Sequence, residues 1–222
     1  MFINKDNKLR WGWIFFGALI VCALVLWGIY WGDNVIYPLI RDNDCWPTSD
    51  GLLCSVAFAF GKIFDTKMWL GASAVSVLFF FLYKAIRNEF DFRYAFVKIK
   101  NSYVFYVFCS VLLAFLTTGL LKVLIGRSRP FVLGGSYFEP WNFEKVAHSM
   151  PSGHTAVSFA ALVMIGMLFP RIKWATWTLA VVIGVSRIYV GAHWPSDVIF
   201  GAFVGMICAD VIKFVLKKIN AK

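Results

Sequence analysis

Three short groups of polar residues interrupt a sequence that is otherwise strongly apolar, and they occupy residues 122–130, 151–154 and 186–197. Ionisable side chains inside apolar helices are costly, so each group is a candidate for function. Single members have ordinary structural explanations, since Ser152 is a good helix N-cap and Asp197 suits the first turn of a helix. Those explanations do not account for the way the three groups complement one another chemically.

Within these groups, Lys122, Arg129 and Arg187 supply three positive charges. The guanidinium of arginine presents a planar fork of N–H donors that suits phosphate oxygens. Ser152 and Gly153 open a helix, whose free backbone N–H groups form a ready anion site, and glycine permits close approach. These residues predict a cradle for a phosphoryl group.

Two of the three histidines and one aspartate could act on a phosphate held there. A carboxylate at Asp197 that accepts one ring N–H of His193 fixes the tautomer and leaves the other nitrogen free to attack phosphorus. His154 remains as a general acid for the departing oxygen. Phosphoryl transfer needs mainly positioning and charge stabilisation, so we expect neither a metal nor a cofactor. The third histidine, His148, is interpreted as a solvated loop residue.

Together the three groups resemble the tripartite signature of the type 2 phosphatidic acid phosphatase superfamily: Lys-x6-Arg-Pro, Pro-Ser-Gly-His and Ser-Arg-x5-His-x3-Asp. Every signature position is filled and every internal spacing is kept. The resemblance implies an all-α membrane fold with its site near the outer surface. It implies His193 as nucleophile, Asp197 as its partner and His154 as acid and then base. It implies that five further signature residues bind phosphate: Lys122, Arg129, Ser152, Gly153 and Arg187. Ser186 is a member of the signature without an assigned role.

The elements that must position these residues are membrane helices. Hydrophobic residues make up 60% of the chain and charged residues only 15%, against about 25% charged residues in soluble proteins. A membrane span needs about 20 mainly apolar residues. Six runs reach this length alone or with their flanks: Trp13–Trp31, Met68–Tyr83, Tyr103–Leu121, Ala156–Phe169, Trp174–Ser186 and Val198–Ala209. We therefore predict a single all-α domain, residues 1–222, with six transmembrane helices. The run Leu52–Phe60 is too short and is expected to lie along the interface.

Charge distribution sets the orientation. Placing both termini inside puts most of the basic residues on inner segments, as the positive-inside rule requires. The first apolar run exceeds the roughly 7–15 residues of a signal-peptide core, so it is interpreted as a retained anchor. We predict a bacterial inner membrane protein with cytoplasmic termini and a periplasmic active site. The net charge of +10 is explained by inner loops facing anionic lipid, without a nucleic-acid partner.

The outer segments carry further candidates. Cys45 and Cys54 lie nine residues apart in the first outer loop and are either a disulfide or two free thiols. The long outer loop Ile125–Pro151 is rich in glycine and proline, which predicts turns rather than helix. Its Arg127 and Lys145 either hold a second phosphate or anionic headgroup, or are simply solvated. The outer acidic residues show no ligand-like clustering with the signature.

The predicted activity is removal of phosphate from a membrane lipid at the outer face through a phosphohistidine. Undecaprenyl pyrophosphate, phosphatidylglycerophosphate, lipid A phosphates and phosphatidic acid all fit, with a polyprenyl pyrophosphate ranked slightly first. The alternative is a phosphotransferase that passes the phosphate to another lipid. A vanadium haloperoxidase shares the signature but resembles soluble proteins, and a glucose-6-phosphatase-like enzyme usually needs more spans.

Overall fold

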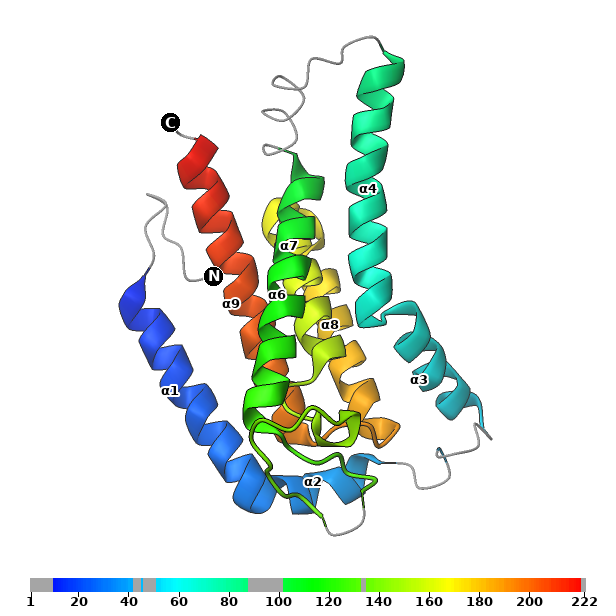
Figure 1. Ribbon diagram of the computed structural model, residues 1–222, viewed down its shortest axis with the longest axis vertical. Helices are drawn as coiled ribbons and strands as arrows, with labels where there is room; N and C mark the ends of the chain where they lie inside the picture. The colour runs from blue at the N-terminus through cyan, green and yellow to red at the C-terminus, as the bar shows by residue number, and fades with distance from the viewer. Residues whose placement is uncertain (1–9, 42–44, 46–50, 88–101, 133–134, 221–222) are drawn as a thin grey trace.

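In the computed structural model the chain is built from helices (Figure 1), and the structure describes residues 10–41, 45, 51–87, 102–132 and 135–220. Helix α1 (Trp11–Trp27) continues through a π-helical turn, Gly28–Gly32, into α2 (Asp33–Ile40). The other helices follow in order: α3 (Leu52–Ile63), α4 (Thr66–Ile86), α6 (Tyr103–Ile125), α7 (Gly153–Leu168), α8 (Lys173–Tyr189) and α9 (Pro195–Asn220).

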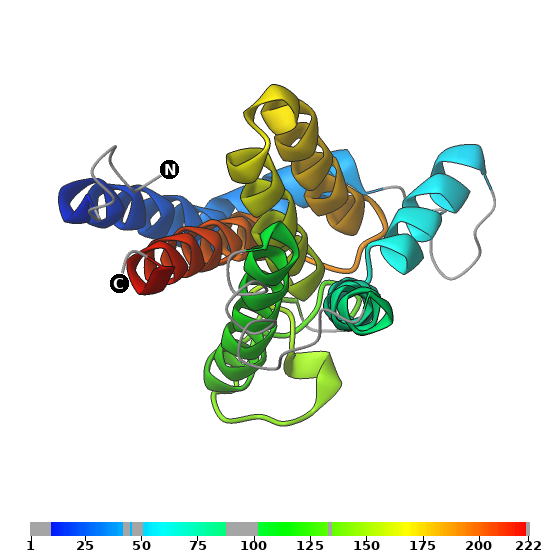
Figure 2. The ribbon, with the colours of Figure 1, turned by 90° about the horizontal axis from the view of Figure 1, so that it is seen from above.

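Helix α7 forms the centre of the bundle and packs against α6, α8 and α9. Its small and apolar side chains are almost completely buried, and Val157 and Ala160 share one core cluster with Val111 of α6. Helix α9 approaches closely because it carries glycine at the contact, where a Cβ on Gly205 would collide with the carbonyl of Ala156. Looking along the bundle, Figure 2 shows α1 beside α9 on one side and α3 and α4 on the other.

Among the described residues, four helical stretches are long and apolar enough to cross a membrane: Trp11–Ile40, Thr66–Ile86, Tyr103–Ile125 and Pro195–Ile219. Large apolar side chains on α1 and α4 face outward, which a soluble protein would avoid; Phe15 and Phe79 are both 68% exposed. The chain is therefore a multi-pass membrane protein. The other two predicted spans lie in α7 and α8, which have only 16 and 17 residues.

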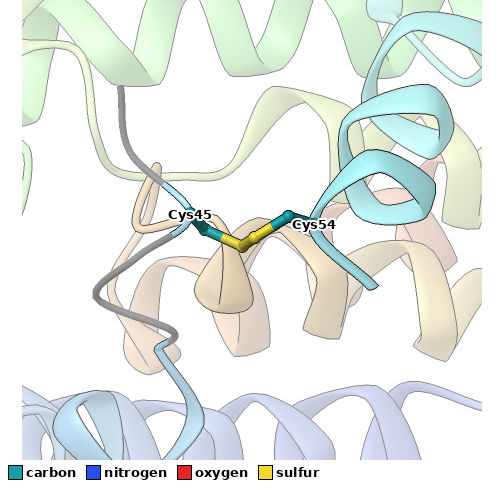
Figure 3. The surroundings of a disulfide bond; sticks show 2 residues. All are labelled: Cys45 and Cys54. Carbon is teal, nitrogen blue, oxygen red and sulfur yellow. A yellow bond between two sulfur atoms is a disulfide. The ribbon is translucent and has the colours of Figure 1, made fainter. Parts of the chain in front are cut away.

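The segment after α2 is closed by a disulfide. Cys45 and Cys54 are bonded (Figure 3), with their Cα atoms 5.4 Å apart. The bond ties the chain beyond α2 to the first turn of α3, so of the two alternatives for these cysteines the disulfide is confirmed. Helix α3 extends the predicted short segment by three residues, to Ile63, and lies obliquely to α4 (Figure 1).

The long loop after α6 is turn-rich, as predicted, and its only helical part among the described residues is the 3-10 turn Lys145–Ala147. Gly126 ends α6 in the left-handed conformation, at φ 61°, where a Cβ would collide with the carbonyl of Glu139. The chain then doubles back, since Glu139 N donates to Gly126 O at 2.8 Å and Ser128 N donates to Tyr137 O at 2.9 Å. Ser149 N donates to Arg127 O at 2.9 Å, which folds the loop against the start of α7.

Candidate active site

One cavity of about 520 Å³ lies where the end of α6, the start of α7, the α3–α4 turn and the α8–α9 turn converge. The structure brings five signature residues to its wall: Lys122, Arg129, Gly153, His154 and His193. Other lining residues include Asp65 and Lys67 from the α3–α4 segment and Lys145 and His148 from the long loop. The cavity is therefore rich in cations and is lined by three imidazoles, those of His148, His154 and His193.

His193 lies in the short turn between α8 and α9 and is buried. Its Nδ1 lies 3.6 Å from Asp197 Oδ2 and 3.5 Å from Ser149 Oγ. The carboxylate is fully engaged, because Oδ2 accepts from Ser149 Oγ at 2.5 Å and from Trp194 N at 3.0 Å, while Oδ1 accepts from Arg127 Nη1 at 2.7 Å. With Nδ1 on the carboxylate side, Nε2 is the ring nitrogen available to the cavity.

Burial controls the protonation of this histidine. The loss of solvation lowers the pKa of His193 to about 3, and the nearby charges of Lys122 and Arg129 lower it further against the opposing effect of Asp197. Burial also lowers the pKa of Arg129, which the charge of Asp197 opposes, and the guanidinium remains a cation at neutral pH. His193 is therefore neutral at physiological pH, the form that a nucleophile requires.

The two cations of the first signature group are held by backbone carbonyls at the cavity. Lys122 Nζ donates to the carbonyls of His148 and Ser149, at 2.6 Å and 3.3 Å. Arg129 Nη1 donates to Ala192 O at 3.3 Å, next to His193. The two cations thus lie beside the imidazole, on a wall formed by two segments that are distant in sequence.

His154 contacts a residue outside the signature. Its Nε2 lies 3.1 Å from Asp65 Oδ2 and 3.3 Å from Gly61 O. One of the outer acidic residues, Asp65, therefore does contact the signature, although a single carboxylate beside a single histidine is not the ligand cluster that a metal ion needs. No sequence signal placed it there, because 89 residues separate it from His154, and its evident role was to cap α4.

Four signature residues with candidate roles lie outside the lining of the cavity: Ser152, Ser186, Arg187 and Asp197. Arg187 is buried and donates from Nη2 to Ala57 O at 2.6 Å and to Ser186 Oγ at 3.0 Å. Ser152 is at the N-cap position of α7, but its side chain caps no backbone N–H. Its Oγ instead accepts a hydrogen bond from Thr155 Oγ1 at 2.9 Å, and its backbone N donates to Asp197 O at 3.0 Å.

The two candidate residues of the long loop, Arg127 and Lys145, lie in different environments. Lys145 lines the cavity, whereas Arg127 is completely buried and does not. Arg127 Nη2 pairs with Asp33 Oδ2 at 2.7 Å, Nη1 pairs with Asp197, and Nε donates to Ser136 Oγ at 3.0 Å. The hypothesis that Arg127 holds a second phosphate, or is simply solvated, is wrong on both counts, because its donors serve buried protein groups.

The structure also gives His148 and Asp33 contacts that the sequence did not indicate. His148 is not simply solvated, because it is partly buried, lines the cavity and places its Nε2 3.0 Å from Asn142 O. Asp33, another of the outer acidic residues, is buried against Arg127 and accepts from Ser196 N at 2.9 Å. In the described part of the chain, no three His, Cys, Asp or Glu side chains are grouped so as to hold a metal ion.

Fold and site define a class of protein: a helical multi-pass membrane protein with a cationic cavity built around two histidines. Residues 102–220 match the PAP2 superfamily, and the chain belongs to this family. The match includes all three signature groups and confirms the resemblance found in the sequence. The segments that carry Asp33 and Asp65 lie outside it.

The chain is similar to two curated lipid A 1-phosphatases. It is 36% identical over 149 residues to that of Rhizobium etli, covering 64% of this chain and 62% of the relative. It is 38% identical over 113 residues to that of Rhizobium johnstonii, covering 48% of this chain and 46% of the relative. The chain thus spans about half the length of the curated relatives it matches.

Among solved structures, the fold is similar to that of the first transmembrane PAP2 type phosphatidylglycerolphosphate phosphatase from Bacillus subtilis. The TM-score is 0.53 at 17% identity, covering 93% of this chain and 95% of that one. This likeness extends the shared fold to the helices that precede residue 102.

Proposed function

We propose that the protein is a metal-independent phosphatase that removes phosphate from a membrane lipid through a phosphohistidine at His193. The observation that carries the proposal is the single cavity that joins Lys122 and Arg129 to His154 and His193. Two cations balance the charge of a phosphate, and the neutral imidazole of His193 can attack it.

The reaction has two halves. In the first, Nε2 of His193 forms a bond to phosphorus while the bond from phosphorus to the lipid oxygen breaks, and His154 gives that oxygen a proton. In the second, water attacks phosphorus, His154 takes its proton, and the bond to His193 breaks to release inorganic phosphate. Asp197 holds Nδ1 throughout and stays ionised, since Arg127 and Ser149 occupy its oxygens.

Phosphate binding is assigned to the backbone N–H groups at the start of α7, with Gly153 at the cavity wall, and to Lys122 and Arg129. The signature also gives this role to Ser152 and Arg187. For Arg187 it requires the guanidinium to exchange its bond with Ala57 O for the phosphate. Ser186 supports Arg187 by accepting its N–H groups.

We further propose six membrane spans, with α7 and α8 as the two short ones, and both termini in the cytoplasm. The basic residues Lys173, Lys217 and Lys218 lie at the ends of α8 and α9 far from the cavity, which suits an inner face. The start of α3, which carries Cys54, lies at the same end of the bundle as the α8–α9 turn (Figure 1), so the disulfide is on the cavity side, which suits an oxidising periplasm. The cavity then opens at the headgroup depth of the outer leaflet.

The proposed substrate class is a lipid that presents a terminal phosphate. A preference for polyprenyl pyrophosphate depended on Arg127 and Lys145 together, and only Lys145 lines the cavity. The relatives named lipid A 1-phosphatases favour the 1-phosphate of lipid A instead. Undecaprenyl pyrophosphate, phosphatidylglycerophosphate and phosphatidic acid complete the set to be compared.

The test is inorganic phosphate release by the purified protein in mixed micelles, with each of these four lipids and with glucose 6-phosphate. We expect a kcat/KM far higher on a lipid phosphate than on the soluble ester, and no release by a His193→Ala variant. Equal efficiency on glucose 6-phosphate would exclude the lipid assignment, and release by His193→Ala would exclude the proposed nucleophile.

A further inference from the structure

Asp65, in the α3–α4 turn, contacts the proposed acid, and both of its oxygens are engaged. Oδ1 accepts from Lys67 N at 2.8 Å and so caps the start of α4, while Oδ2 lies 3.1 Å from His154 Nε2. The cap holds the carboxylate in one orientation, because Oδ1 is bound to the backbone of the helix it precedes. The histidine is about three-quarters buried, with 25% of its side chain exposed.

The charges around His154 come from three elements. Burial is the largest influence on the His154 ring and lowers its pKa; the charges of Arg187 on α8 and Arg129 on the long loop lower it further, whereas Asp65 raises it. Gly61 of α3 presents a carbonyl to the same nitrogen as Asp65. Between two guanidinium groups, a protonated imidazole depends on a nearby anion, and Asp65 is the carboxylate in contact with it.

We infer that Asp65 is a positioning residue for the acid–base step, which rests on the proposed function of His154. The carboxylate accepts the Nε2–H, fixes the ring and its tautomer, and favours the imidazolium form. Nδ1 is then the nitrogen that exchanges the proton. It gives a proton to the lipid oxygen as the bond to phosphorus breaks, and later takes one from the attacking water. Asp65 stays ionised and exchanges no proton.

Two variants of Asp65 separate this role from the capping of α4. Asparagine keeps a good N-cap and a hydrogen-bond acceptor but removes the charge, and serine keeps the cap but is too short to reach His154. For Asp65→Asn we expect a fall in kcat of about 10- to 100-fold, part of the roughly 10²–10⁴-fold contribution of general acid–base catalysis, with KM little changed. The kcat of Asp65→Ser should fall further than that of Asp65→Asn. The matched control is Glu144→Gln, which removes one exposed carboxylate from the long loop and should leave kcat unchanged.

The pH profile gives a readout that a purely structural role would not move. Without the carboxylate, the imidazolium loses its counter-charge beside Arg187 and Arg129, so the alkaline limb of kcat/KM should move to lower pH in Asp65→Asn. Glu144→Gln should retain the wild-type profile. A wild-type kcat and profile in Asp65→Asn would overturn the inference.

A double-mutant cycle with His154→Ala completes the test. If Asp65 acts through His154, the variant Asp65→Asn/His154→Ala should be no slower than His154→Ala alone. Additive losses would show that Asp65 acts elsewhere and would overturn the inference while leaving the phosphatase intact. Wild-type activity in His154→Ala would instead remove the acid from the proposed function, so the two failures are distinguishable.

Discussion

Arg127 and Asp197 form a completely buried ion pair, with Nη1 2.7 Å from Oδ1. The pair connects the loop after α6 to the first turn of α9, and the same carboxylate faces His193 through its other oxygen. Arg127 lies only two residues before Arg129, the arginine at the cavity wall, yet its guanidinium contacts the carboxylate that faces His193 rather than the cavity. The Arg127 guanidinium also lies over an aromatic side chain, 5.4 Å from the centre of the Trp194 ring.

The first prediction concerns this pair. Arg127→Ala leaves Asp33 and Asp197 as buried carboxylates without their cation, a change that typically costs about 3–5 kcal/mol. We expect a marked fall in the unfolding temperature in detergent and loss of activity. Arg127→Lys keeps a charge but not the fork, so it should fold better than Arg127→Ala and still show a reduced kcat. A wild-type unfolding temperature in Arg127→Ala would contradict this account.

The nucleophile can be tested by trapping. Wild-type protein given a ³²P-labelled lipid phosphate and quenched in alkali should carry an acid-labile label, and His193→Ala should carry none. His154→Ala should still form the label but turn over about 10²–10⁴-fold more slowly. Label that persists in His193→Ala would assign the phosphoenzyme to another residue.

The low pKa of His193 predicts a pH-dependent stability. The folded protein keeps this imidazole neutral down to a pKa of about 3, whereas the unfolded chain takes up a proton near the ordinary value of 6.5. Stability is therefore lost as pH falls from about 6.5 toward 3. His193→Gln cannot take up that proton. Its unfolding temperature should therefore drop less between pH 7 and pH 4.5 than that of the wild type. Parallel curves for the two proteins would show that His193 does not contribute.

Metal dependence is tested by chelation. Because cations from the protein line the cavity, activity should persist in excess EDTA, and vanadate should inhibit by occupying the cavity as a phosphate mimic. The measurement is phosphate release before and after chelation, with added magnesium as the control. Complete loss in EDTA that magnesium restores would require a different mechanism.

Orientation is tested by labelling from outside the cell. A background without Cys22, Cys109 and Cys208 retains the disulfide and offers no other thiol. Phe143→Cys, on the cavity side and 77% exposed in the native residue, should react with an impermeant maleimide. Arg171→Cys, in the exposed turn between α7 and α8, should react only after permeabilisation. The reverse pattern would invert the topology.

The sequence allowed the helical class, the family and the three signature groups to be predicted, because spacing within each group is local. It did not indicate which distant residues support the site. Three such contacts join residues far apart in sequence: Ser149 with Asp197, Asp65 with His154, and Asp33 with Arg127. From the sequence alone, the first residue of each pair looks like an ordinary loop or cap residue. Arg127 is a lone arginine in an outer loop of the sequence, where such residues are usually solvated, and only the fold reveals the two carboxylates that it pairs with.

The Arg127–Asp33 pair joins residues that are 94 positions apart, and this has a consequence for assembly. During synthesis Asp33 enters with the first helix, long before its cation is made, and Asp197 follows Arg127 by another 70 positions. A carboxylate near membrane depth is unfavourable until it is paired. The ionic cluster can therefore close only when the last helix is in place. Asp197 both closes the cluster and faces His193, so chains that have not finished assembling do not yet hold the imidazole of the proposed nucleophile in place.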